Sequence, residues 1–366
     1  MGKVKTDRTR KSSERTNSLD FPTYFGSRRP SGRPVPTMAD VARHAGVSTM
    51  TVSRALKNDA KVSSPTREKI LRTVSELGYV LDQAAGSLSS RKTGFIAALV
   101  PSINNSNFSD TARGITDELG RADLQLLLGY TDYSDESEER LIEAMLRRRP
   151  EGVILTGGVH TPHTRRMLSS AAIPVIETWD LPREPIDQVV GFSNEEAMHL
   201  LIMTLAAKGY RRFGYVGGTT TRDSRGEQRR KGFMRALDEL GLAPGRIVSW
   251  GVPPISIEHG GPAIVTLLER WPDTEVVAFV SDLPAFGALM ECKRRNIQVP
   301  EQVAIAGFGD YEVGAFSHPR ITTVDVDCYG IGRLAARRLI ELLHAGGSRH
   351  DEIIMTSFRV IERESA

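Results

Sequence analysis

The sequence predicts a small all-α unit followed by an α/β core of two doubly wound subdomains. Two observations carry this prediction. Residues 37–80 contain short runs with apolar residues at helical spacing, separated by glycine and serine. From Gly94 onward, apolar strand-like runs alternate with amphipathic segments in two successive series. Near-continuous apolar strands between helices are typical of parallel sheets covered on both faces, so each series predicts one doubly wound subdomain.

Composition and charge narrow the class of protein. The chain has 366 residues, 40% hydrophobic and 25% charged, which is typical of a globular protein with about two or three domains. Residues 1–92 hold 18 Lys/Arg and 8 Asp/Glu, whereas the remainder holds 30 and 37. A basic N-terminal quarter on an acidic body indicates an anionic partner, most simply nucleic acid. For residues 1–36 alone, a solvated, disordered basic tail is the simpler interpretation.

Other classes are disfavoured. Cys292 and Cys328 lie far apart and outside any C-x-x-C pattern, which indicates a reducing compartment. Because no apolar run is long enough to span a membrane and no signal peptide is evident, we expect a cytoplasmic protein without a membrane partner. His160 and His163 lack neighbours at metal-ligand spacing, so we expect loop histidines and no metal. We expect no cofactor and no enzyme, because P-loop, G-x-S-x-G and H-E-x-x-H motifs are missing.

The stretch TMADVARHAGVSTMTVSRAL predicts two short helices joined by a tight turn. Thr37, with Asp40 three residues later, forms an approximate capping box. Gly46 can adopt the left-handed conformation that ends the first helix, and Ser48 can cap a second helix starting at Thr49. Two short helices at a steep angle are helix-turn-helix geometry, in which the second helix enters the major groove of DNA. From spacing alone, any small three-helix bundle remains an alternative.

A third helix completes this unit. It is expected to be capped at Ser64, with Pro65 at its first position, and to end at Gly78. The residues expected on its core face are Ile70, Leu71, Val74 and Leu77.

Residue identity adds a family resemblance. The run M-A-D-V-A-x-x-A-G-V-S-x-x-T-V-S-R-x-L, continued by V-S-x-x-T-R-E-K-I and E-L-G-Y, resembles the headpiece of the lac repressor family of bacterial transcription regulators. The resemblance implies a homodimer that binds double-stranded DNA at a palindromic operator. It implies base contacts from Thr49, Met50 and Arg54. The other residues expected to contact DNA are Thr37, Ser48, Thr51, Ser53, Thr66 and Leu88.

The resemblance also divides the chain into segments. The expected order is a disordered basic tail, a helix-turn-helix headpiece, a hinge linker and an effector-binding and dimerisation domain, at residues 1–36, 37–80, 81–92 and 93–366. In that last domain, which resembles periplasmic sugar-binding proteins, the N-subdomain is expected at about 93–191 and 325–345, and the C-subdomain at about 192–324 and 346–366.

The linker resembles a hinge helix that family members form on the operator. Ala84, Ala85 and Leu88 have its spacing, and Leu88 matches a leucine that wedges into the minor groove. Gly86 stands where an arginine is usual. Because glycine costs a helix about 1 kcal/mol relative to alanine, we expect this hinge to fold less readily. Packing of Leu88 against the core is the alternative.

The core is expected to bind an effector between its lobes. By position, Phe108 matches an aromatic residue that packs on the effector, Asp180 a carboxylate that accepts hydroxyl hydrogen bonds, and Arg229 an arginine that anchors the ligand. Each has a structural alternative: plain core, a strand-end cap and a solvated helix face. The full set of expected effector-binding residues is Phe108, Asp180, Phe192, Arg229, Ser281 and Asp310.

The effector class follows from a closer resemblance. The runs GVILTGGVHTPHTRRML, AAIPVIETWD and VVGFSNEEA look most like gluconate-operon repressors within the family. A guanidinium fork at Arg229 suits a carboxylate. Gly309 stands where many relatives have an aspartate, and losing that carboxylate favours an anionic ligand. We therefore expect gluconate, its phosphate or a related sugar acid. A neutral sugar or nucleobase, or a two-lobed solute-binding protein, remains the alternative.

Overall fold

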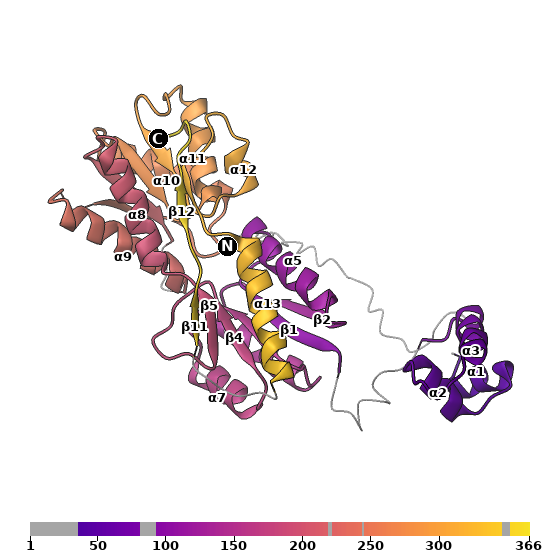
Figure 1. The fold of residues 1–366 in the computed structure, drawn as a ribbon. Coiled ribbons are helices and arrows are strands. Elements are labelled where there is room, and N and C mark those ends of the chain that lie inside the picture. Colours follow the sequence, from indigo (N-terminus) through magenta and orange to yellow (C-terminus); the bar gives the residue numbers. More distant parts are fainter. Residues whose placement is uncertain (1–35, 81–92, 219–221, 244, 346–351) are drawn as a thin grey trace, which may run out of the picture. The chain divides into compact units, whose positions relative to one another are not determined.

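The computed structural model describes residues 36–80, 93–218, 222–243, 245–345 and 352–366. They fall into two compact units, a small helical one within residues 1–85 and a large α/β one within residues 86–366 (Figure 1). The expected tail up to residue 35 and the expected hinge, including Leu88, lie outside the described residues. Among the described residues, no helix is long and apolar enough to cross a membrane.

The small unit consists of the helices α1 (Met38–Ala45), α2 (Thr49–Leu56) and α3 (Ser64–Leu77). The capping box at the start of α1 is confirmed, since the Asp40 N–H donates to the Thr37 hydroxyl and the Thr37 N–H donates to the Asp40 carboxylate. Gly46 has a φ of 63° and ends α1 as predicted. Ser48 caps α2 by accepting a hydrogen bond from Thr51 N–H at 3.1 Å.

Two details of α3 differ from the expectation. Ser63, rather than Ser64, is the N-cap residue. Leu71, expected in the core, is 48% exposed, and Thr73 is buried instead. The reason is the helical repeat: with Ile70 fully buried, the positions three, four and seven residues later share its face, and Leu71 lies about 100° away.

The N-lobe of the large unit is built on a parallel six-stranded sheet in the order β11-β5-β4-β3-β1-β2. Its strands are β1 (Phe95–Val100), β2 (Gln125–Tyr130), β3 (Val153–Thr156), β4 (Val175–Thr178), β5 (Gln188–Gly191) and β11 (Ile353–Met355). Side chains alternate along the strands, so one face packs on α5 (Ser106–Gly120) and α13 (Cys328–His344). The other face packs on α6 (Asp135–Leu146) and α7 (Pro162–Ser170).

The C-lobe repeats this architecture with a parallel sheet in the order β7-β6-β8-β9. The strands are β6 (Phe213–Gly217), β7 (Arg246–Ser249), β8 (Val276–Phe279) and β9 (Ala304–Ala306). One face is covered by α8 (Asn194–Ala207) and α9 (Ser224–Glu239), and the other by α10 (Ile257–Arg270) and α11 (Asp282–Arg294). A short helix, α12 (Glu312–Ala315), and an antiparallel pair, β10 (Thr323–Asp325) and β12 (Arg359–Ile361), complete the lobe.

In the described residues, the chain passes between the lobes after β5, between β10 and α13, and between β11 and β12. The last crossing corrects the expected division, which assigned residues 346–366 to the C-subdomain. Ile353–Met355 instead pair with β5 of the N-lobe, where they extend the parallel sheet. This strand is only three residues long, so its sequence does not show to which lobe it belongs.

Candidate effector cavity and DNA-reading helix

The outer surface of α2 presents the residues expected to read DNA. Met50 is 60% exposed, and Thr49 and Arg54 are also exposed. The hydroxyls of Ser48 and Thr51 lie 2.8 Å apart in the cap of α2, at the end of the helix that would approach the phosphate backbone. DNA binding by these residues, and by Thr37, Ser53 and Thr66, stays a prediction.

A cavity of about 130 Å³ lies between the two lobes. Its wall is formed by segments that follow β1, β2 and β4 of the N-lobe and β6, β7, β8 and β9 of the C-lobe, together with the start of α5 and α9. This is the carboxyl edge of both sheets, where ligands bind in doubly wound folds. Three of the six expected effector residues lie in the wall: Phe108, Arg229 and Ser281.

One side of the cavity is aromatic. Phe108 and Trp179 pack edge to face with ring centroids 5.2 Å apart, and the Trp179 indole N–H donates to the Thr111 hydroxyl at 3.1 Å. Phe192, expected to contact the effector, is fully buried behind this wall and does not line the cavity. Its ring lies 6.0 Å from Trp179 and 6.4 Å from Phe308, so it supports two rings that do line the cavity.

Arg229 is the best-positioned anion ligand in the wall. Its Nε donates to the Asn194 side chain at 2.9 Å and its Nη1 to the Val280 carbonyl at 2.7 Å. The guanidinium carbon lies 3.8 Å from the centre of the Phe308 ring. Burial lowers the pKa of Arg229, although the group stays cationic because an arginine pKa starts so high. The side chain is thus a buried cation held in one orientation by neutral partners.

A second arginine lies one helical turn earlier on α9. The Arg225 guanidinium lies 5.4 Å from the centre of the Phe108 ring and 5.9 Å from that of Tyr133, so two N-lobe rings flank a C-lobe cation. Its nearest carboxylate oxygen is Asp223 Oδ1, 3.9 Å from Nε, which is too long for a hydrogen bond. Burial raises the pKa of Tyr133 to about 12, so its phenol remains a hydrogen-bond donor at neutral pH.

Asp180 is buried but does not line the cavity. One of its carboxylate oxygens accepts hydrogen bonds from the Gln228 amide and from the Leu181 N–H, both at 2.8 Å. Asp180 therefore links the N-lobe to α9 of the C-lobe. The structure supports the alternative of a strand-end residue with a structural role.

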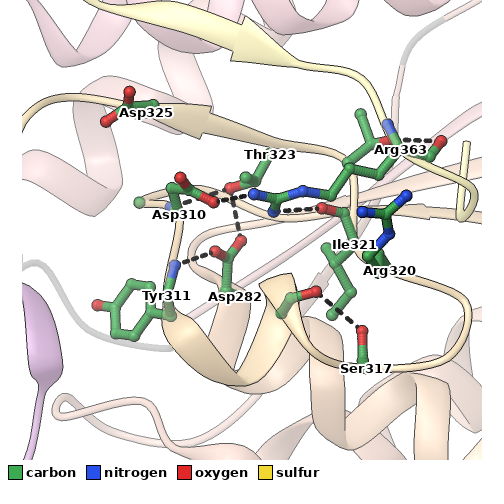
Figure 2. Close-up of polar contacts among 12 residues, drawn as sticks. Asp282, Asp310, Tyr311, Ser317, Arg320, Ile321, Thr323, Asp325 and Arg363 are labelled. Carbon is green, nitrogen blue, oxygen red and sulfur yellow. Dashed lines mark hydrogen bonds and ion pairs between the residues drawn. The ribbon is translucent and has the colours of Figure 1, made fainter.

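Ser281 lines the cavity and does not cap α11, so its hydroxyl is available to a ligand. Asp282 lies directly behind it and is fully buried. Figure 2 shows that its carboxylate accepts hydrogen bonds from the Tyr311 N–H and the Thr323 hydroxyl, both at 2.7 Å. Burial raises the pKa of Asp282 to about 7 despite these bonds. Asp282 thereby fixes the wall residue Tyr311.

Asp310 also lies outside the cavity wall. Its carboxylate pairs with Arg363, which in turn donates to the Ile321 carbonyl at 3.0 Å (Figure 2). The preceding residue, Gly309, has a φ of 116° and accepts a hydrogen bond from the Asn107 side-chain amide at 3.0 Å. A Cβ on Gly309 would lie 2.4 Å from that amide nitrogen and 2.5 Å from a Tyr311 ring carbon, so an aspartate here requires both side chains to move.

Sequence reasoning missed much of the wall, including Asn107, Tyr133, Trp179, Asp223, Arg225, Phe308 and Tyr311. One signal was present, since Arg225 stands four residues before Arg229 and therefore on the same helix face. Tyr133 had none, because a left-handed backbone with a φ of 55° directs it into the cavity wall.

A second buried polar cluster lies away from the cavity, around His160, which stands in the loop before α7 as expected. Its ring is 1% exposed and lies 2.8 Å from a Glu138 oxygen and 3.4 Å from a Glu177 oxygen. Burial alone would lower the pKa of His160, but the hydrogen bonds and charges of the two glutamates outweigh it and raise the pKa to about 9. His163, also expected in a loop, is instead exposed at the start of α7.

Comparisons with known proteins agree with this architecture. Residues 37–82 match the family described as bacterial regulatory proteins, lacI family, and residues 202–366 match the periplasmic binding protein-like domain. The HTH-type transcriptional regulator GntR of Pseudomonas aeruginosa is 37% identical over 337 residues, which cover 92% of this chain and 97% of that protein.

Solved structures extend the comparison. A LacI family transcriptional regulator from Silicibacter pomeroyi is 44% identical, with a TM-score of 0.70 over 74% of this chain and 98% of that one. The lac repressor dimer bound to operator and the anti-inducer ONPF has a TM-score of 0.78 over 91% of this chain and 99% of that one, at 20% identity, which shows the shared fold.

Proposed function

Since the chain belongs to the lacI family of bacterial regulatory proteins, we propose that it is a repressor whose operator binding is weakened by a sugar acid such as gluconate. It is a DNA-binding transcriptional regulator, and its relatives are regulators rather than enzymes. Members of this family bind DNA operators and small-molecule effectors and form dimers. We further propose a homodimer on a palindromic operator, because two copies of the helix-turn-helix would match its two half-sites. Acting on bacterial DNA places it in the cytoplasm.

The observation that supports a sugar acid as the effector is that the buried Arg229 guanidinium lacks a carboxylate partner in the part of the chain that the structure describes. Among the described residues, no carboxylate lies within 4.0 Å of this buried guanidinium, and Nη2 donates no hydrogen bond. A buried charge without a charged partner is unfavourable. A ligand carboxylate in the cavity would supply the missing partner and accept a charge-assisted hydrogen bond.

The cavity also explains how the effector can act on DNA binding. Its ligand would touch Phe108 and Trp179 of the N-lobe and Arg229 and Ser281 of the C-lobe. The ligand therefore favours the relative position of the lobes in which residues of both lobes contact it. A ligand shifts an equilibrium only by its differential affinity for the two states. A coupling free energy of about 2–3 kcal/mol would weaken operator binding about 30- to 150-fold.

The test is a fluorescence anisotropy titration on palindromic DNA from the protein's own upstream region, at fixed salt. We expect gluconate to weaken binding within the range given above and glucose to have no effect. Arg229→Gln should bind the operator normally without ligand, which shows that it folds, but should ignore gluconate. Arg230→Gln, whose arginine pairs with Glu227 on the surface, is the matched control and should respond like the wild type. Equal responses to glucose and gluconate, or a responsive Arg229→Gln, would contradict the proposal.

A further inference from the structure

We propose that Asp223 reads a hydroxyl group at the uncharged end of the effector and thereby restricts the cavity to singly charged hydroxy acids. Asp223 was not among the residues expected to bind the effector, and it lines the cavity. The inference rests on the proposed effector class and narrows it.

One carboxylate oxygen of Asp223 is a hydrogen-bond acceptor without a donor in the described part of the chain. This atom, Oδ1, is buried and has no hydrogen-bond partner among the residues that the structure describes. An aspartate at this N-cap position usually accepts a hydrogen bond from the first turn of the helix, but Asp223 does not cap α9. Gly226 leaves room for the carboxylate, since a Cβ there would lie 2.6 Å from Asp223 Oδ2. Because a buried acceptor without a donor is unfavourable, a ligand hydroxyl would be bound there.

The other carboxylates near the cavity are already occupied. Asp180 accepts from Gln228, Asp310 pairs with Arg363, and Asp282 accepts from Tyr311 and Thr323. Among the described residues of the cavity wall, Asp223 is the one acidic side chain. The task of accepting a ligand hydroxyl, expected of Asp180, therefore falls to Asp223.

The charge of the wall sets the charge of the ligand. Among its described residues, Arg225 and Arg229 are positively charged and Asp223 is negatively charged, so the wall has one positive charge in excess. One ligand carboxylate at Arg229 balances this excess. A second anionic group near Asp223 would meet a like charge in a buried site, where screening by solvent is weak.

The spacing along α9 separates the two ends of the ligand. Asp223 immediately precedes the helix, and Arg229 follows six residues later. At a rise of about 1.5 Å per residue, their Cα atoms are about 9 Å apart along the helix axis. The hydroxyl at Asp223 therefore belongs to the far end of a chain of several carbons, which describes an acid such as gluconate. We therefore expect a three-carbon hydroxy acid to reach both groups less well, and a sugar diacid to place its second carboxylate at Asp223.

The experiment is isothermal titration calorimetry on the full chain with gluconate, glucarate and glycerate. Glucarate has the same six carbons as gluconate, with a second carboxylate in place of the terminal CH2OH group. We expect the wild type to bind gluconate at least about tenfold more tightly than either other acid. Asp223→Asn keeps the shape and an acceptor but removes the charge. It should reduce the preference for gluconate over glucarate to about threefold or less.

Asp180→Asn is the matched control, because Asp180 is buried beside the cavity but bonded to Gln228, and it should keep the wild-type preference. Operator binding without ligand verifies that each variant folds. If gluconate binds but its preference over glucarate is small, or is unchanged in Asp223→Asn, this inference is overturned and the proposed function stands. If none of the three acids binds, the proposed effector class fails as well.

Discussion

The headpiece and the α/β core position their functional residues in opposite ways. In the headpiece, the candidate base contacts Thr49, Met50 and Arg54 are exposed on one short helix, whose direction is set by a capping box and one left-handed glycine within 20 residues of sequence. In the core, the candidate ligand contacts are buried and come from distant segments. The hydrogen bond from Asn107 to Gly309, for example, joins residues 202 positions apart.

The two functional regions therefore depend on different parts of the fold. The DNA-reading surface requires that three helices pack on one small core, whereas the cavity requires that two lobes meet in one relative position. A substitution inside the headpiece should therefore affect operator binding alone, and a substitution between the lobes should affect the ligand site first.

The largest expected effect is that of Ile70→Ala. Ile70 is fully buried in the headpiece, and truncating such a residue costs about 2–5 kcal/mol. A single small core supplies about 3–5 kcal/mol at most, so the headpiece should unfold. We expect operator affinity to fall by at least about 100-fold, while gluconate titrations of the same protein stay unchanged. Leu71→Ala, one residue along and 48% exposed, should retain operator binding. Loss of ligand binding in Ile70→Ala would contradict the separation of the two regions.

Gly309→Asp tests the α/β core, in which the two lobes must meet. A side chain here meets a φ of 116° and a Cβ contact of 2.4 Å with Asn107 Nδ2. Strained backbone at a residue other than glycine costs about 1–3 kcal/mol, before the overlap is added. We expect the core to unfold at a lower temperature in calorimetry and gluconate binding to be lost. Gly120→Ala on α5, where a Cβ would meet nothing within 4 Å, should leave both measurements unchanged.

The core should also lose stability as the pH rises from about 6.5 to about 9. The pKa of His160 is raised to about 9 in the folded protein, so the protonated histidine stabilises the fold fully below its unfolded pKa of about 6.5. That contribution, up to about 3 kcal/mol for a side chain buried to this degree, is lost as the pH rises through 9. Thermal unfolding at several pH values measures it.

His160→Gln should flatten the decline above pH 8, a range in which Asp282, with a pKa of about 7, no longer titrates. A decline of the same size in the variant would exclude His160 as its source. The headpiece has no comparable buried cluster among its described residues, so its own unfolding should vary less over this range.

The smallest expected effect is that of Thr37→Ala, which removes the hydroxyl of the capping box. Loss of an N-cap side chain costs about 1 kcal/mol, so the headpiece should unfold at a slightly lower temperature without DNA present. Thr37→Ser keeps the hydroxyl and should restore the wild-type value. An unchanged unfolding temperature in Thr37→Ala would show that the cap contributes little to the headpiece.

The sequence was most informative where structure is determined locally. The cap at Thr37, the turn at Gly46 and the cap at Ser48 each form hydrogen bonds only with residues up to four positions away. The two series of strands were visible because each buried strand is a continuous apolar run. The short strand Ile353–Met355 escaped detection, because its position depends on pairing with β5 more than 160 residues earlier.

The candidate site was predictable only in part. Phe108, Arg229 and Ser281 lie in the cavity wall, where the resemblance implied they would. Asp180 and Asp310 were reasonable carboxylates, but each meets a partner from a distant segment, Gln228 in one case and Arg363 in the other. No local pattern indicates such pairings, which arise only when distant segments come together in the fold.

The placement of Asp223 just before α9, and of Arg225 and Arg229 in its first two turns, bears on how regulators of this kind diversify. The charged side chains that would discriminate between ligands share α9, and the rings opposite them belong to the N-lobe. A new inducer preference can thus arise through two or three substitutions in a segment of seven residues, with the DNA-reading helix left intact. For a laboratory seeking biosensors for other organic acids, randomising those positions is the most economical library.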